Sequence, residues 1–161
     1  MPYFLPDAEL LAQCREEASR SSGPGGQHMQ KTASAVRLVH LSSGTTVQCQ
    51  DHRERARNRA DALQHLRLQL AIRIRGVGRS ADLDLHRRGR QLALGANAQH
   101  YPAVVGCLLD ALAACEGSLA LAATQLAVST SQLTKLLTAD KAVHQAANAI
   151  RAAAGLVPLR S

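Results

Sequence analysis

The sequence has very few aromatic residues, and this shortage limits how its core can be built. Among 161 residues there are one Phe, two Tyr and no Trp. Aromatic rings supply much of the buried area in many domains, so this core has to come from Leu, Ala and Val side chains. We therefore expect a largely helical chain, long enough for one domain or for one domain with a small addition.

The sequence also lacks paired cysteines and long apolar runs. Cys14, Cys49, Cys107 and Cys115 stand far apart, which is not the spacing of a zinc site or of a disulfide framework. We expect buried free thiols, no metal and no cofactor. Residues 1–17 lack the basic and apolar regions of a signal peptide, and no segment is long enough to span a bilayer. The sequence thus predicts a cytoplasmic protein that makes no membrane contact.

Acidic residues are scarce in the first hundred positions. The formal net charge is +7, and residues 1–100 contain 15 Lys and Arg against 9 Asp and Glu, whereas residues 101–161 contain 4 against 3. Clustered basic residues suit a polyphosphate ligand such as RNA, because each neutralised phosphate releases counterions. A basic surface that simply keeps the protein in solution is the alternative interpretation.

The N-terminal part combines helix and strand patterns. Asp7 can cap a first helix that ends near Arg20, before a glycine-rich stretch. Alternating residues over 34–40 and β-branched residues over 45–50 predict a β-hairpin around the turn LSSG. Residues 53–74 then have the three- and four-residue spacing of a long helix. Its predicted apolar stripe consists of Ala56, Ala60, Leu63, Leu66, Leu70 and Ile74. Its opposite side and ends are expected to carry Arg53, Arg55, Arg57, Arg59, Arg67, Arg73 and Arg75.

The composition changes after residue 76. Residues 77–100 mix glycine and charge without a steady period and are interpreted as a linker with one short turn of structure. Residues 101–161 are rich in Ala and Leu and predict helices near 102–115, 118–126, 129–138 and 140–154, the last ended by Gly155. We therefore predict an α+β fold, with a first domain over 1–76 in which helices pack on a small sheet, then a linker and an all-α bundle.

The stretch SSGPGGQHMQK at positions 21–31 contains three glycines and a proline but no acid or thiol. In order and spacing, residues 19–66 resemble the catalytic domain of class I peptide chain release factors and of their smaller, codon-independent ribosome-rescue relatives. The resemblance lies in SRSSGPGGQH, KTxSAVRLxH, QCQD and the helix start with Arg53, Asn58 and Arg59. A flexible linker would not be followed by this hairpin and helix, and the spacing does not fit a phosphate-binding P-loop.

The resemblance implies peptidyl-tRNA ester hydrolysis with Gly25, Gly26 and Gln27 as the catalytic residues. A backbone N–H can stabilise developing charge without changing its protonation, and two glycines let the chain approach closely. The resemblance assigns that donor to the Gln27 amide and makes methylation of Gln27 a further expectation. His28 stands next to Gln27, but the family chemistry needs no imidazole. Two positions depart from the family pattern, Gln30 and Ala33, and they leave the anchoring of the loop in question.

The expected partners are the ribosome, through large-subunit rRNA, and peptidyl-tRNA. The residues expected to contact RNA are Arg20, Ser21, His28, Lys31, Arg37, Arg53, Arg55, Arg57, Asn58 and Arg59. Only 18 residues precede the resemblance, so we expect no codon-reading domain and a role in rescue of stalled ribosomes.

The C-terminal part raises alternatives. Residues 117–137 resemble a helix-turn-helix of the Fis type, with Ala127 where Gly is common in the turn. A plain helical bundle, a module that binds nucleic acid and a module that docks on a protein or on the ribosome all remain open. For the whole chain, the alternatives to a hydrolase are a helix-turn-helix regulator and a catalytically inactive ribosome-binding factor.

Overall fold

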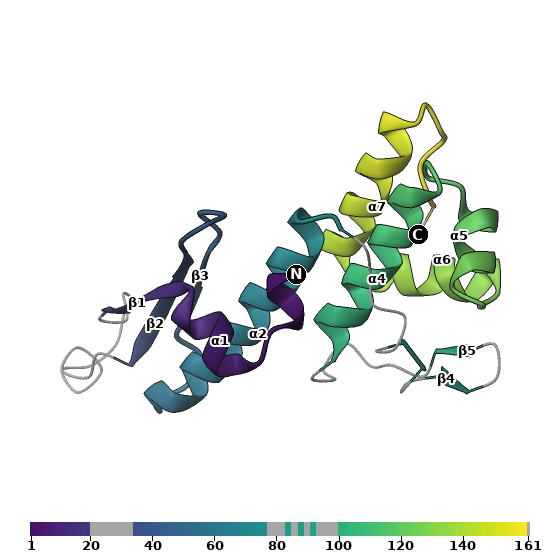
Figure 1. The fold of residues 1–161 in the computed structure, drawn as a ribbon. Helices are drawn as coiled ribbons and strands as arrows, with labels where there is room; N and C mark the ends of the chain where they lie inside the picture. The colour runs from purple at the N-terminus through teal and green to yellow at the C-terminus, as the bar shows by residue number, and fades with distance from the viewer. Residues whose placement is uncertain (20–33, 77–82, 85–86, 89–90, 93–99, 161) are drawn as a thin grey trace. The chain divides into compact units, whose positions relative to one another are not determined.

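The structure is a computed structural model that describes residues 1–19, 34–76, 83–84, 87–88, 91–92 and 100–160 (Figure 1). The chain divides into two compact units, one spanning Pro2–Leu70 and the other comprising Met1 and Ala71–Ser161. The first unit contains a three-stranded sheet, and the second is mostly helical. The predicted α+β fold, a small sheet with helices followed by a helical part, is confirmed. The division at residues 76 and 100 stays a prediction.

The sheet consists of β1 (Cys14–Ser19), β2 (Ala35–His40) and β3 (Thr46–Cys49), with β2 in the centre. Both outer strands run antiparallel to β2. Gly44 turns the chain between β2 and β3 with a φ of +66°, and its amide donates to the His40 carbonyl at 2.8 Å. Glycine adopts this left-handed conformation without steric cost. The predicted hairpin is therefore confirmed.

The first helix is shorter than predicted. The pattern predicts a helix from Asp7 to near Arg20, but α1 covers only Asp7–Ala12. Residues 14–19 form β1 instead, and each of them pairs with a residue of β2. The strand ladder satisfies the backbone groups that a helix would satisfy internally, so pairing with a distant strand overrides local helix propensity.

The long helix predicted over residues 53–74 is present as α2 (Arg55–Arg73), but the face that it buries differs from the prediction at the helix start. Of the predicted apolar stripe, only the three leucines are buried, whereas Ala56 and Ala60 are exposed. The buried residues of α2 are Asn58, Ala62, Leu63, Leu66, Arg67, Leu70 and Ala71. The prediction was wrong at the helix start because the position that faces the sheet there is occupied by a polar residue, Asn58.

Arg67 was predicted to lie on the charged, solvated side of this helix, and the structure places it in the interior. Its Nη2 lies 2.6 Å from Asp7 Oδ1, and its Nη1 donates to the carbonyl of Tyr3 at 3.1 Å. Tyr3 belongs to a short 3-10 helix, η1 (Pro2–Phe4). A buried guanidinium is tolerated when its donors are satisfied in this way. Arg67 therefore ties the N-terminal segment to α2.

The second unit contains four helices that match the predicted ranges within one residue at each end. They are α4 (Tyr101–Ala114), α5 (Leu119–Gln125), α6 (Thr130–Thr138) and α7 (Lys141–Ala153). The caps explain this agreement. Ser118 accepts from the Leu121 amide, Ser129 from the Gln132 amide and Asp140 from two amides of α7. Gly155, with a φ of +72°, follows the end of α7 as predicted.

The stretch predicted as a linker contains more structure than one turn. Strand β4 (Arg87–Arg88) pairs antiparallel with β5 (Gln91–Leu92). The side chains of Leu83 and Leu92 are buried, which supplies the apolar contact that a solvated linker would lack. Among the described residues, no helix has both the length and the apolar character needed to cross a membrane.

Candidate functional site

Seven of the predicted site residues lie outside the described residues. These are Arg20, Ser21, Gly25, Gly26, Gln27, His28 and Lys31. What the structure does describe is how the segment that contains them is attached. The segment follows Ser19, the last residue of β1, and leads to Ser34, directly before β2. Ser19 pairs with Ala35 across the two strands, so both ends of the segment are held side by side at one end of the sheet (Figure 1).

Asn58, in the first turn of α2, connects three parts of the chain. Its Nδ2 donates to the carbonyls of Ser34 and His52, at 2.8 Å each. Its Oδ1 accepts from the His52 amide at 2.8 Å, and the Cys49 thiol lies 3.6 Å away. An Asn amide offers two donors and two lone pairs, and all of them are used here.

The position of Asn58 departs from the prediction that it binds RNA. Its side chain has 0% of its surface exposed, and its polar atoms are already bound to protein groups. An RNA ligand could reach it only if this part of the unit came apart. The structure therefore places Asn58 among the groups that hold the unit together.

Arg55 and Arg59 lie one helical turn apart on α2 and share one carboxylate. Arg55 Nη2 lies 2.8 Å from Glu16 Oε1, and Arg59 Nε lies 2.8 Å from Glu16 Oε2. Hydrogen bonding from Arg59, and then from Arg55, holds the pKa of Glu16 below its usual value although partial burial opposes this. The two arginine side chains remain 51% and 48% exposed. The cluster therefore keeps one uncompensated positive charge at the surface.

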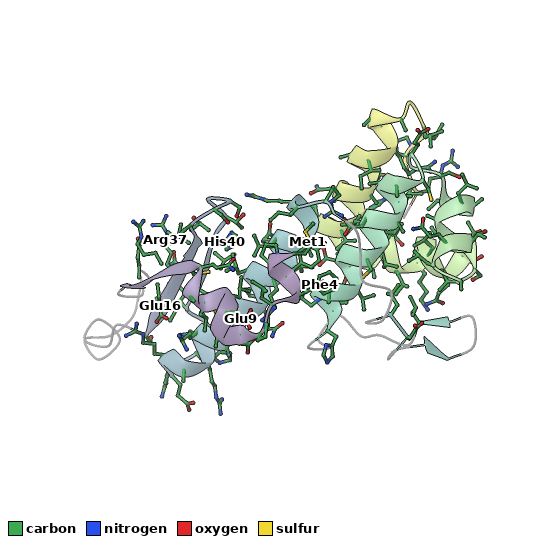
Figure 2. The ribbon with its side chains drawn as sticks, in the orientation of Figure 1. Met1, Phe4, Glu9, Glu16, Arg37 and His40 are labelled. Carbon is green, nitrogen blue, oxygen red and sulfur yellow. The ribbon has the colours of Figure 1, made fainter. Side chains whose placement is uncertain are left out.

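Two other predicted arginines are also exposed and pair with different carboxylates. Arg57 pairs at 3.1 Å with Glu54, the residue directly before α2, and Arg37 lies 3.7 Å from Glu17 on the neighbouring strand. Arg37 and Glu16, both labelled in Figure 2, belong to opposite faces of the sheet, because Arg37 pairs with Glu17 and successive strand residues alternate.

Arg53 is exposed. No hydrogen bond or ion pair between described residues involves it. The predicted arginines are thus divided between the start of α2 and the outer face of the sheet.

Sequence reasoning missed Glu16 and His52. Glu16 was assigned to a helix, which hid its position opposite the arginines of α2. The sequence feature that could have revealed this contact is charge, because the two glutamates before the glycine-rich stretch are opposite in charge to the basic start of the helix. His52 precedes that helix, and its Nε2 lies 2.8 Å from Asp61 Oδ2. This contact, like that of Asn58, fixes the chain between β3 and α2.

No described group of three or more His, Cys, Asp or Glu side chains is arranged to hold a metal ion. The cysteines are free thiols in the structure: Cys49 and Cys107 are buried, and Cys14 and Cys115 are partly exposed. Burial raises the pKa values of the Cys14 and Cys49 thiols, which disfavours their reactive thiolate forms.

The second unit contains the segment that resembles a helix-turn-helix. The chain turns between α5 and α6 at residues 126–129, and Ala127 has a φ of +52°. The guanidinium of Arg151 donates hydrogen bonds to the carbonyls of Gly117 and Val157. A nucleic-acid-binding surface usually needs several basic residues, and this segment has few of them. The resemblance to a helix-turn-helix stays a prediction.

Comparison with known proteins identifies the family. A family model described as the RF-1 domain matches residues 10–97, which is more than half of the chain and includes β1, β2, β3 and α2. Peptide chain release factor 2 from Bordetella avium (strain 197N) is 52% identical over 59 residues, which is 37% of this chain. The chain spans about 16% of the length of that relative. The chain therefore belongs to the RF-1 domain family and contains a domain like that of class I release factors.

Proposed function

We propose that this protein hydrolyses the ester bond of peptidyl-tRNA on the ribosome without reading a codon, and thereby rescues stalled translation complexes in the cytoplasm. The observation that carries the proposal is the triplet Gly25, Gly26 and Gln27 within the RF-1 match, in a segment attached at the paired residues Ser19 and Ala35. The name of the matched relative, peptide chain release factor 2, points to the same class of reaction.

The proposed chemistry needs no ionisable group of the protein. A water oxygen bonds to the acyl carbon of the peptidyl ester, and the bond from that carbon to the tRNA ribose oxygen breaks. The water loses a proton, the ribose oxygen takes one up, and the products are a free peptide and a deacylated tRNA. The Gln27 amide donates to the oxygen that becomes negative, and Gly25 and Gly26 allow the backbone to come close. Positioning by the ribosome and the tRNA supplies much of the remaining rate enhancement.

The arginines at the start of α2 support the proposal as RNA contacts. Arg55, Arg57 and Arg59 are about half exposed or more, and a guanidinium can bind a phosphate through two parallel hydrogen bonds. In this proposal they contact large-subunit rRNA or peptidyl-tRNA together with Arg53 and Arg37. Asn58 is left out of this set because it is buried.

The experiment that tests the proposal is peptide release by a Gly26→Ala variant. On ribosomes stalled on a truncated mRNA, the wild type should release peptide, and the variant should lose about 100- to 1000-fold of the rate, as expected when a catalytic backbone donor is lost. The variant should keep the melting temperature and ribosome affinity of the wild type. Gly23→Ala, which alters a glycine of the same segment outside the triplet, is the matched control and should lose much less. Full release by Gly26→Ala would refute the assigned chemistry.

The codon-independent part of the proposal needs its own comparison. Release from truncated-mRNA complexes should exceed release from complexes with a stop codon in the decoding site. Greater activity on the stop codon would refute codon independence, and equal activity would refute only the preference for stalled complexes. Either result leaves the ester hydrolysis standing.

A second candidate function is nucleic-acid binding by α5 and α6, favoured by the short turn at residues 126–129 and by the capping of α6 by Ser129. Specific binding to a DNA duplex at physiological salt, without ribosome binding, would support it. Ribosome binding without release from any complex would instead support an inactive ribosome-binding factor.

A further inference from the structure

The first two turns of α2 contact both strands from which the glycine-rich segment departs. On the β1 side, Glu16 lies three residues before the end of the strand and binds Arg55 and Arg59. On the β2 side, the carbonyl of Ser34 accepts a hydrogen bond from Asn58. One helix end is therefore joined both to β1 and to the residue directly before β2.

The two attachments differ in chemistry. The Glu16 contacts are ion pairs at the surface, which salt screens and which a phosphate can replace. The Asn58 contact is a neutral hydrogen bond with no solvent access, so it does not depend on ionic strength. When a charged RNA ligand approaches α2, the Asn58 contact is the one that stays unchanged.

We propose that Asn58 is a positioning residue for peptide release, and that its hydrogen bond to the Ser34 carbonyl fixes where the Gly25-Gly26-Gln27 segment returns to the sheet. The inference rests on the proposed function, because the segment is positioned for ester hydrolysis. Asn58 suits this task because its amide also binds both backbone groups of His52. These two hydrogen bonds fix the orientation of the Asn58 amide toward the Ser34 carbonyl.

The reasoning predicts a specific kinetic defect. If the Ser34 attachment is lost, the backbone donor of Gln27 is aimed less accurately at the ester, although the RNA-binding arginines are unchanged. Misplacement by about 1 Å can cost roughly 100-fold in rate. We therefore expect a lower kcat with little change in KM.

The experiment compares three variants of the full chain in peptide release from truncated-mRNA complexes. Asn58→Asp keeps the size and the acceptor oxygen but turns an oxygen toward the carbonyls of Ser34 and His52. Cys49→Ala removes only the thiol contact to Asn58. Asn148→Ala is the matched control in the helical unit, where Asn148 accepts from the Leu159 amide at 2.7 Å.

We expect Asn58→Asp to lower kcat by about 10- to 100-fold and to change KM by less than about threefold. Cys49→Ala should keep the wild-type kcat, and Asn148→Ala should lower only the melting temperature. Amide hydrogen exchange over residues 34–40, measured without ribosomes, should become faster in Asn58→Asp and stay unchanged in Asn148→Ala. Asn58→Ala serves as a second variant if the aspartate does not fold.

Three outcomes would overturn the inference. The first is a folded Asn58 variant with wild-type kcat. The second is an Asn58 variant whose KM rises while kcat is kept. The third is failure of both Asn58 variants to fold, which would make Asn58 a folding determinant alone. If the wild type releases no peptide, the proposed function fails instead. Unchanged exchange over residues 34–40 in Asn58→Asp would then also refute the attachment.

Discussion

Replacing Arg55, Arg57 and Arg59 together with alanine tests whether the start of α2 binds ribosomal RNA. The three side chains are exposed, and each already has a carboxylate partner, Glu16 or Glu54. The replacement removes three cations and leaves both carboxylates without these partners. RNA phosphates should therefore meet a surface that has changed from basic to acidic, and ribosome affinity should fall.

The magnitude follows from counterion release. Each lost phosphate contact makes the slope of log K against log salt shallower by about 0.7 to 0.9, so three contacts change it by about 2 to 3. Over a fourfold rise in salt, the wild-type affinity should then fall about 20- to 40-fold further than the variant affinity. Exposed ion pairs contribute roughly 0.2 to 1 kcal/mol each to stability. The variant should consequently stay folded, because Asn58 and the buried leucines of α2 are untouched.

The assay is equilibrium binding to purified ribosomes at several salt concentrations, with the melting temperature measured in parallel. Arg73→Ala is the control, since Arg73 is an exposed cation in the last turn of the same helix. Its slope should match that of the wild type. A triple variant that melts normally and keeps the wild-type slope would remove these arginines from the interface and refute the reasoning.

Two further predictions concern stability. His40 is buried, its Nδ1 lies 2.8 Å from the Ser43 hydroxyl, and burial lowers its pKa below the ordinary value of 6.5. The unfolded chain takes up a proton near that ordinary value and the folded chain only below it. The contribution of neutral His40 to the stability of the fold is therefore complete above about pH 6.5, and it is lost as the pH falls toward the folded-state pKa. Urea unfolding should show that His40→Gln loses less free energy of unfolding than the wild type when the pH falls from about 7.5 to about 5.5. Equal losses in the two proteins would exclude His40 as the cause. Ala127→Gly should raise stability by about 0.5 to 1 kcal/mol, because Ala127 has a φ of +52° and glycine removes the Cβ clash of that conformation. A lower melting temperature would show that this strain is not significant.

Sequence alone predicted the helical unit well because its signals are local. Ser118, Ser129 and Asp140 each accept from amides within three residues, and Gly155 comes two residues after the last residue of α7. Caps of this kind are visible as residue types at fixed spacings. The hairpin was predicted for the same reason, since its alternation and its glycine turn lie within one short stretch.

The features that were missed depend on partners far away in the sequence. Arg67 contacts Tyr3 across 64 positions, Arg55 contacts Glu16 across 39, and Asn58 contacts Ser34 across 24. No periodicity marks these pairs, and a polar residue on a helix is ordinarily assigned to solvent. The interior positions of Arg67 and Asn58 therefore became apparent only with the fold. The glycine-rich motif was found from sequence because its chemistry lies in consecutive residues.

In the proposed function, these distant contacts give the start of α2 two tasks, RNA binding and placement of the glycine-rich segment, which would conflict if one kind of interaction served both. RNA phosphates would compete with Glu16 for Arg55 and Arg59, because surface ion pairs are weak and a charge-assisted pair with phosphate is stronger. Such an exchange would loosen the β1 attachment at the moment when the catalytic segment has to be placed accurately. The Asn58 hydrogen bond to Ser34 lies inside the unit and carries no charge, so the exchange does not weaken it. In the proposed function, a buried neutral contact beside a surface charged one lets a single helix bind RNA and still hold the glycine-rich segment in place. A change at Asn58 should therefore impair the placement of the segment and leave RNA binding intact.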